Sequence, residues 1–367
     1  MDKIGIYIHI PFCESKCPYC DFYSINNSDE HSNYVNNLKS IILKYSKLHK
    51  RQVQTVYFGG GTPSVIGSDL LIEILNQIKC CFDVDSDAEV TLEVNPCSAD
   101  KLNFSSLRAS GFNRLSIGLQ SANDNELKVL GRRHTANKAK EVVNKAKEAG
   151  FNNMSLDLML CVPQQTKNSL TESIRFCKDC DVQHISAYIL KIEENTPFYK
   201  IKDTLDLFDD DMQAQMYLHA VNELEKYGFA QYEISNFSKP EFQGKHNLKY
   251  WRDEEYLGFG PSAHSYIDGK RYYYNRSIKD FYEDKIIYDC DGGDIEEYIM
   301  LKLRLKEGLN IKNITEKYNV KPSEKLFKLL DKLQQNQLID FKDDTISLTP
   351  QGFLISNTII NYIVDCF

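Results

Sequence analysis

The chain has 367 residues, 42% of them hydrophobic, which is enough for two or three domains with real hydrophobic cores. Lys and Arg total 44 against 52 Asp and Glu, so the formal charge is −8 and a nucleic-acid partner is disfavoured. No run is apolar enough for a membrane span, and Met1–Pro11 lacks a secretory cleavage site, which favours a cytoplasmic location. Eleven cysteines in such a chain indicate free thiols or metal ligands.

Short apolar runs alternate with stretches of helical period over residues 1–230, which is typical of parallel β/α units. The pattern predicts an α/β fold whose helices include Tyr34–His49. Six units are too few for a full eight-unit barrel and favour an open, partial one. The predicted strands are Ile4–Ile10, Val53–Phe58, Glu89–Val94, Arg114–Gln120, Met154–Leu160 and His184–Leu190.

Alternation within these strands predicts an interior lined by polar side chains. Tyr7 lies opposite the isoleucines of the first strand, and later strands set Glu93, Gln120 and Asp157 opposite their apolar residues. Because β/α folds place their sites at the carboxyl ends of the strands, we expect these four side chains to share an interior there. The alternative is a set of ordinary strands with a polar face towards solvent.

The pattern changes after residue 230. Residues 231–290 are aromatic, contain glycines and lack a clear helical period, which predicts a connector wrapped on the barrel. Residues 291–367 predict a small winged-helix-like α+β domain, in which acidic and basic residues nearly balance and DNA reading is disfavoured. Its predicted parts are helices Ile295–Lys306 and Ser323–Gln334, strands Leu338–Phe341 and Ile346–Leu348, and a last helix with Thr349 as N-cap and Pro350 as first residue.

The strongest chemical signal is the spacing Cys13-x3-Cys17-x2-Cys20, in the loop that follows the first predicted strand. Three thiolates so close together suit an iron–sulfur cluster, because such clusters are held by cysteine thiolates. Three protein ligands leave one iron of a four-iron cluster open to an external ligand. The alternative is a structural zinc site that also uses His9.

A glycine-rich loop, Gly59-Gly60-Gly61-Thr62-Pro63, follows the second predicted strand. Successive glycines let backbone groups approach a small ligand closely, although a glycine run after a strand is also typical of a tight turn. No lysine follows the glycines, so the loop is not a phosphate-binding P-loop.

Together these motifs resemble the radical S-adenosylmethionine superfamily, in its coproporphyrinogen-oxidase-like branch. The order and spacing of the matching segments extend the resemblance over nearly the whole chain. Besides the cysteine and glycine motifs and Asp157-Leu158, they are Tyr7-Ile-His-Ile-Pro-Phe-Cys13, Glu93-Val-Asn-Pro96, Asn113-Arg-Leu-Ser-Ile-Gly-Leu-Gln120 and Leu130-Gly-Arg-Arg-His-Thr135.

The resemblance implies a partial (β/α)6 barrel in which Cys13, Cys17 and Cys20 hold a [4Fe–4S] cluster. The open iron of that cluster would bind the amino and carboxylate groups of S-adenosylmethionine. The matching positions imply the contacts of this cofactor: Tyr7 and Tyr19 beside the cluster and adenine, Gly60, Gly61 and Thr62 at the methionine part, and Glu93, Gln120, Arg132 and Asp157 at the amino, carboxylate and ribose groups.

Within this branch, two departures from the HemN dehydrogenase type make the chain more similar to the HemW type, regarded as haem chaperones. The cysteine motif begins at Cys13 without a long preceding extension, and Phe22 stands where the dehydrogenase type has a further cysteine. The segment His246-Asn-Leu-Lys-Tyr250-Trp251 is a further HemW-like feature.

The resemblance therefore implies a protein that binds haem through His246 and transfers it to an acceptor protein, such as a respiratory one, and it leaves a homodimer open. On the residues alone, a hydrogen-bonded core histidine is the alternative for His246, and His264 is the next candidate ligand. The alternative function is an oxygen-independent coproporphyrinogen III dehydrogenase, which cleaves S-adenosylmethionine reductively and decarboxylates a porphyrinogen.

The other cysteines are interpreted as packing residues. Cys177 and Cys180 lie in the predicted helix Leu170–Cys180 without a second pair nearby, which argues against a metal or redox site. The remaining six are expected to behave as small buried hydrophobic residues: Cys80, Cys81, Cys97, Cys161, Cys290 and Cys366.

Overall fold

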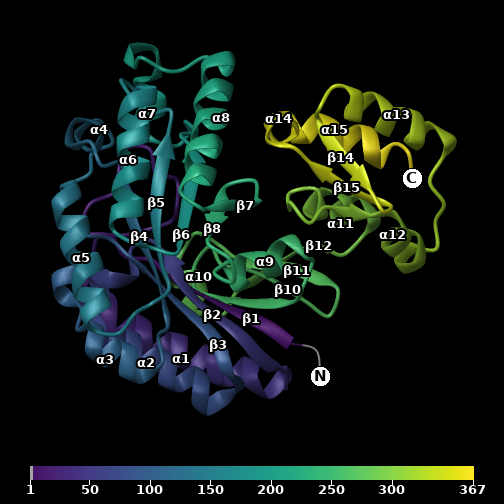
Figure 1. Ribbon diagram of the computed structural model, residues 1–367. Helices are drawn as coiled ribbons and strands as arrows, with labels where there is room; N and C mark the ends of the chain where they lie inside the picture. The colour runs from purple at the N-terminus through teal and green to yellow at the C-terminus, as the bar shows by residue number, and fades with distance from the viewer. Residues whose placement is uncertain (1–2) are drawn as a thin grey trace.

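Six parallel strands in chain order form the centre of the fold, as predicted (Figure 1). The computed structural model describes residues 3–367. Each strand pairs with the next one along the chain, so the β/α units lie side by side in an open barrel. The strands are β1 (Lys3–Ile10), β2 (Gln52–Gly60), β3 (Asp83–Val94), β4 (Arg114–Gln120), β5 (Met154–Leu160) and β6 (His184–Ile189).

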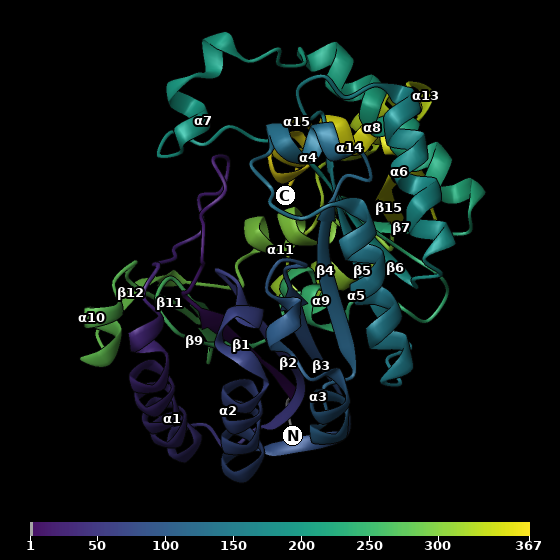
Figure 2. The same ribbon diagram turned by 90° about the vertical axis from the view of Figure 1, so that its left-hand side faces the viewer.

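Helices cover the outer face of this sheet (Figures 1 and 2). The isoleucines of β1 are fully buried on that side, because alternate residues of a strand point to the same face. Opposite them, α1 buries Val35, Leu38 and Ile42 at helical spacing. The helices are α1 (His31–Leu48), α2 (Gly67–Cys81), α3 (Phe104–Ser110), α4 (Asp124–Val129), α5 (Ala136–Glu148), α6 (Lys167–Asp179), α7 (Pro197–Lys200) and α8 (Asp210–Lys226).

Residues 231–290, predicted as a connector, contain strands that extend the sheet at both edges. The antiparallel strands β7 (Ala230–Glu233) and β8 (Asn236–Ser238) follow β6, and β9 (Tyr256–Phe259) pairs in parallel with β1. The result is a twelve-stranded sheet in which each of the six barrel strands pairs with a neighbour on both sides. The other elements are β10 (His264–Ile267), β11 (Lys270–Tyr274), β12 (Ile286–Asp291), α9 (Lys245–Trp251) and α10 (Ile278–Tyr282).

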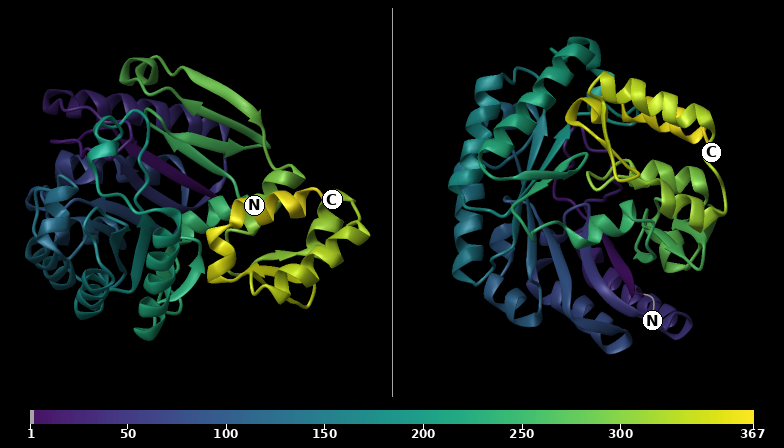
Figure 3. Two further views of the ribbon diagram at one scale, coloured as in Figure 1. Left: turned by 90° about the horizontal axis from the view of Figure 1, so that it is seen from above. Right: turned by 45° about the vertical axis from the view of Figure 1, so that its right-hand side comes forward.

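The C-terminal part forms a small α+β domain beside the barrel (Figure 3). Thr349 caps the helix that begins at Pro350, as predicted, because its side chain accepts a hydrogen bond from the Gly352 amide. A three-stranded antiparallel sheet and two helices more than predicted complete the domain. Its elements are α11 (Ile295–Lys302), β13 (Leu309–Asn310), α12 (Ile311–Tyr318), α13 (Glu324–Gln335), β14 (Ile339–Lys342), β15 (Thr345–Leu348), α14 (Pro350–Leu354) and α15 (Ser356–Val364).

The expectation for the cysteines outside the triplet is partly wrong. Cys177, Cys180, Cys161 and Cys366 are buried, but Cys80 and Cys290 are exposed, and Cys81 and Cys97 are half-buried. Cys80 lies near the end of α2, and Cys290 lies on the edge strand β12. Within residues 3–367, no helix is both long and apolar enough to cross a lipid bilayer.

Tyr34 connects the first helix to the end of the first strand. It is fully buried in α1, and its hydroxyl donates a hydrogen bond to the carbonyl of His9. Tyr34→Phe is expected to lower the free energy of unfolding by about 1–2 kcal/mol, because a buried carbonyl loses its donor. Chemical denaturation measures the change. The control Tyr288→Phe, which removes an exposed hydroxyl bonded to Asp291, should stay within about 0.5 kcal/mol.

Candidate functional site

Polar side chains line the concave side of the barrel, as the alternation predicts. Tyr7, Glu93 and Asp157 are half-buried and face a common interior, so the alternative of a solvent-facing polar surface is not what the structure shows. Glu93 Oε1 accepts a hydrogen bond from Tyr57 at 2.8 Å, and Asp157 Oδ1 accepts one from Ser116 at 3.0 Å. Each carboxyl group is thus held by a side chain from a neighbouring strand of the sheet.

Burial changes the acidity of both carboxyl groups. It raises the pKa of Glu93 to about 7, with the Asp157 charge acting in the same direction and the bonds from Tyr57 and the Gly60 amide opposing it. Burial also raises the pKa of Asp157, against the hydrogen bonds from Ser116 and Ser186. A carboxyl group with its pKa near 7 binds a cation far better in its ionised form.

The three cysteines of the motif are half-buried free thiols on one loop between β1 and α1. Hydrogen bonds from Cys13 N to Ile25 O and from Ile25 N to Pro11 O close the base of this loop. Figure 2 shows the loop rising towards α7, where the Phe198 amide donates to the Pro18 carbonyl at 2.9 Å. The loop is therefore anchored at its base and at its tip.

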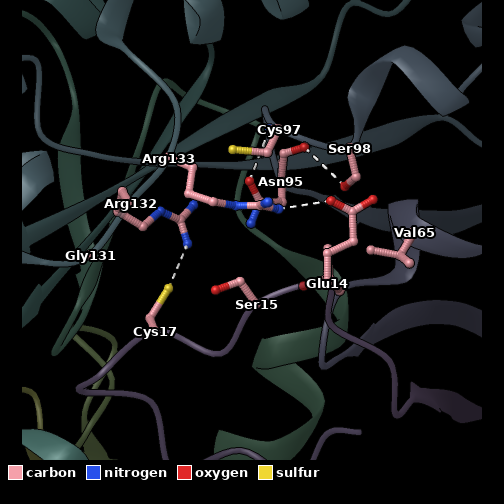
Figure 4. Close-up of a pocket in the computed structure, with 11 residues that line it drawn as sticks. Glu14, Ser15, Cys17, Val65, Asn95, Cys97, Ser98, Gly131, Arg132 and Arg133 are labelled. Atoms are coloured by element: carbon pink, nitrogen blue, oxygen red, sulfur yellow. Dashed lines mark hydrogen bonds and ion pairs between the residues drawn. The ribbon is translucent and has the colours of Figure 1, made fainter. Parts of the chain in front are cut away.

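Arg132 lies against the cysteine loop (Figure 4). Its guanidinium donates to Cys17 Sγ at 3.7 Å and to the Gly118 carbonyl at 2.7 Å, whereas its buried Nε has no partner among residues 3–367. A methyl group built on Gly118 would lie 2.9 Å from Arg132 Nη2 and 3.2 Å from the Gln120 amide, so both side chains converge there. Tyr19 packs on Phe198 from the cysteine loop.

The glycine loop packs tightly between the end of β1 and the interior. The Gly61 amide donates to the Ile10 carbonyl at 2.9 Å, and a Cβ on Gly61 would lie 2.8 Å from the Phe12 carbonyl oxygen. Gly60 has φ = 110°, which favours glycine. Thr62 Oγ1 lies 3.1 Å from Cys13 Sγ. Close packing therefore accounts for part of this glycine run.

Two cavities adjoin these residues. One, of about 350 Å³, lies between the cysteine loop and the end of β3 and includes Cys17, Thr62, Asn95, Cys97 and Arg132 (Figure 4). The second, of about 490 Å³, opens in the barrel interior and is lined by Tyr7, Phe22, Tyr57, Gly60, Glu93, His246, Asn247 and Tyr250. Tyr7, Gly60 and Glu93, which are implied for S-adenosylmethionine, thus meet His246, which is implied for haem, in the second cavity, whereas Thr62 and Arg132 line the first.

His246 is almost fully buried, with 1% of its surface exposed. Its Nδ1 pairs with Thr55 Oγ1 at 2.7 Å and its Nε2 with the Tyr250 hydroxyl at 2.7 Å, and burial lowers its pKa to about 3. The carboxylate of Glu89 accepts from the amides of Lys245 and His246 and so fixes the start of α9. In this structure His246 is a hydrogen-bonded core histidine, which is the alternative that the residues alone left open.

His9 does not have the geometry of a zinc ligand. Its Nε2 donates to the Tyr23 carbonyl at 3.0 Å, and its Nδ1 accepts from Tyr7 at 3.2 Å. No three ligating side chains within residues 3–367 converge as they would on a single metal ion.

Sequence reasoning missed several residues of the site, among them Tyr57, Asn95 and Arg133. Tyr57 alternates with buried residues in β2, so the same period-two argument that selected Tyr7 would have found it. Asn95 and Arg133 stand inside quoted motifs, but only the fold shows that they line one cavity.

Comparison with known proteins gives consistent results for sequence and fold. Residues 7–177 match the radical SAM superfamily model, and residues 294–355 match the HemN C-terminal domain model. The heme chaperone HemW of Bacillus subtilis (strain 168) is 36% identical, with 96% of this chain and 97% of that protein covered. HemW of Lactococcus lactis subsp. lactis (strain IL1403) is 32% identical, with 96% and 95% covered.

The solved structure of coproporphyrinogen III oxidase (HemN) from Escherichia coli, described as a radical SAM enzyme, has the same fold. The superposition covers 100% of this chain and 90% of that chain, with a TM-score of 0.83 and 23% sequence identity. Because HemW relatives match this chain over nearly its full length, the chain belongs to the HemW family within the radical SAM superfamily.

Proposed function

We propose that this protein is a haem chaperone, which binds haem and passes it to an acceptor protein. The observation that carries the proposal is the similarity to HemW proteins along nearly the whole chain, from the cysteine loop to the C-terminal domain. The acceptor is a haem-requiring protein such as a respiratory one. A cytoplasmic location and a homodimeric state belong to the same proposal.

The cysteine loop is the proposed site of a [4Fe–4S] cluster with Cys13, Cys17 and Cys20 as its ligands. Three free, half-buried thiols on an anchored loop fit this group, and the Arg132 guanidinium beside Cys17 offsets the negative charge of the thiolates. When bound, the cluster supplies an open iron for the amino and carboxylate groups of S-adenosylmethionine.

The residues around the cluster loop fit S-adenosylmethionine by their chemistry. The unpartnered Nε of Arg132 suits a carboxylate, and the carboxyl groups of Glu93 and Asp157 suit an ammonium group and ribose hydroxyls. Gly60, Gly61 and Thr62 present backbone and hydroxyl groups for the methionine part, Gln120 offers an amide, and Tyr7 and Tyr19 offer rings for the adenine.

His246 is the proposed axial ligand of haem iron, and the cavity beside it receives the macrocycle. Because burial keeps the imidazole neutral, a proton on Nδ1 that bonds Thr55 leaves a lone pair on Nε2. The Tyr250 hydroxyl bonds that lone pair in this structure. Binding then requires Tyr250 to turn away, so that iron replaces its hydroxyl on Nε2.

The cluster assignment predicts that Cys17→Ala abolishes the broad visible absorption of the anaerobically reconstituted protein, because a thiolate ligand is lost. The fold should remain, as circular dichroism would show. Cys80→Ala is the control, since Cys80 is an exposed cysteine on α2 and its variant should load a full cluster. A full cluster in Cys17→Ala would contradict the assignment.

Glu93 predicts a pH dependence of S-adenosylmethionine binding. With a pKa of about 7, the carboxyl group is mostly protonated at about pH 6 and mostly ionised at about pH 7.5. If it pairs with the ammonium group, affinity should rise roughly five- to tenfold across that interval, and Glu93→Gln should bind weakly with little pH dependence. Anaerobic calorimetry measures both; equal pH profiles for the two proteins would remove Glu93 from the site.

The same raised pKa of Glu93 makes the stability of the fold decrease with pH, whereas it makes the affinity for S-adenosylmethionine increase with pH. Between about pH 4.5 and pH 7 the folded protein keeps a proton that the unfolded chain has released, so Glu93 costs stability as the pH rises through this window. We therefore expect the free energy of unfolding to fall more steeply with pH in the unmodified protein than in Glu93→Gln. Denaturation at several pH values provides this independent check.

The haem assignment predicts that His246→Leu loses the spectrum of histidine-ligated haem and keeps the iron–sulfur cluster. Tyr250→Phe should keep or strengthen ligation, because it removes the hydroxyl that competes for Nε2. His264→Leu is the control, since His264 is exposed and stacks on Tyr273. An unchanged spectrum in His246→Leu would move the ligand elsewhere.

The chaperone proposal also predicts that coproporphyrinogen III stays unconverted when cluster, reductant and S-adenosylmethionine are all supplied. The protein has Phe22 in place of the additional cysteine of the dehydrogenase type. Formation of protoporphyrinogen at about 0.01 per second or faster would favour the dehydrogenase instead. The haem-binding assay and the coproporphyrinogen assay use the same reconstituted sample, so that a failed reconstitution is recognised in both.

A further inference from the structure

Phe22 is an apolar side chain that the fold leaves in water. Its surface is 67% exposed, more than that of any other large hydrophobic residue described in residues 3–367. It lies two residues after the last cysteine of the motif and forms part of the wall of the 490 Å³ cavity. A single exposed apolar residue is ordinary on a protein surface, but Phe22 differs because its exposed ring lines a cavity with other aromatic side chains.

The backbone on both sides of Phe22 is held in place. Asp21 pairs with Arg276 through two hydrogen bonds of 3.2 and 2.6 Å. The Tyr23 carbonyl accepts from His9 at 3.0 Å, and the Tyr23 hydroxyl accepts from the Ile278 amide at 3.2 Å. Because these partners come from β1 and from the segment around α10, the backbone that carries Phe22 is held at a fixed place.

Phe22 also stands directly beside the cysteine loop, two residues after Cys20, a proposed cluster ligand, and its side chain lines the cavity. A molecule that covers the ring lies next to the cluster loop.

The cavity beyond Phe22 has mostly aromatic walls and few polar groups. Tyr7, Tyr57 and Tyr250 contribute rings, and Tyr7 stacks on Tyr57 with a centroid separation of 6.2 Å. Glu93, His246 and Asn247 supply the polar groups besides the tyrosine hydroxyls. Apolar walls with a small number of placed polar groups are typical of sites for flat cofactors.

We propose that Phe22 is the stacking platform for the haem macrocycle, whose plane covers the ring of Phe22 while its iron faces the His246 side of the cavity. The inference rests on the proposed haem-binding function and adds the surface on which the macrocycle lies. It makes Phe22 a specificity residue for a large planar, mainly apolar ligand. The substitution of a phenylalanine for a cysteine at this position then favours haem binding.

The test is an anaerobic haem titration of the full-length protein with its cluster reconstituted, followed by haem absorbance and by emission of the single tryptophan, Trp251. Phe22→Ala should weaken haem binding about ten- to a hundredfold, the fold-change expected when the burial of one phenyl ring is lost. Phe22→Leu should lose less, because it keeps apolar bulk. Tyr362→Ala removes an exposed aromatic ring from α15 and should change nothing.

The outcomes separate this inference from the function on which it rests. If the unmodified protein binds no haem, the proposed function fails. If it binds haem and both Phe22 variants, with full clusters, bind equally well, the platform is overturned and the chaperone function stands. If Phe22→Ala instead turns a dimer into a monomer at unchanged haem affinity, Phe22 belongs to an interface between copies and the inference is again overturned. Should Phe22→Ala fail to load its cluster, Phe22→Leu decides alone: an unchanged affinity overturns the platform and a reduced one supports it.

Discussion

The close packing of the glycine loop against the end of β1 fixes the position of the whole site. Gly61 approaches the Ile10 and Phe12 carbonyls too closely for a side chain, so β2 ends directly beside the start of the cysteine loop. This contact sets Thr62 next to Cys13 and Gly59 next to Glu93. The start of the cysteine loop and the Glu93 carboxyl group therefore lie beside the glycine loop.

The interior keeps charged groups out of bulk water, and the fold compensates for this with paired partners. Glu93 receives a hydrogen bond from Tyr57, Asp157 receives one from Ser116, and Arg132 donates to a thiol and a carbonyl. The compensation is incomplete, as the raised pKa of Glu93 and the unpartnered Nε of Arg132 show. Groups left in this state gain from a charged ligand, because binding supplies the partners that the protein itself does not provide.

His246 has a structural role in this fold besides its proposed role as a haem ligand. Its imidazole stacks on Tyr57 at 5.2 Å and bonds both Thr55 and Tyr250, so the motif holds α9 against the barrel before any ligand arrives. The bond to Tyr250 is the one that can open, since Tyr250 faces the cavity and Thr55 is buried in β2. In the proposed function, the His246 side chain therefore supports the fold while it bonds Tyr250 and binds haem once that bond opens.

The sequence by itself determined the six central strands and the faces of their side chains, because period-two alternation is local. It also located the cysteine loop and, with the family resemblance, the residues expected around the cofactor. The strands at both edges, the partners of His246 and the exposure of Phe22 were decided only by the tertiary structure. These features depend on contacts between distant segments: Thr55 and His246 are 191 residues apart, and Asp21 and Arg276 are 255 apart. No local pattern encodes such contacts, since they form only when the sheet brings the segments together.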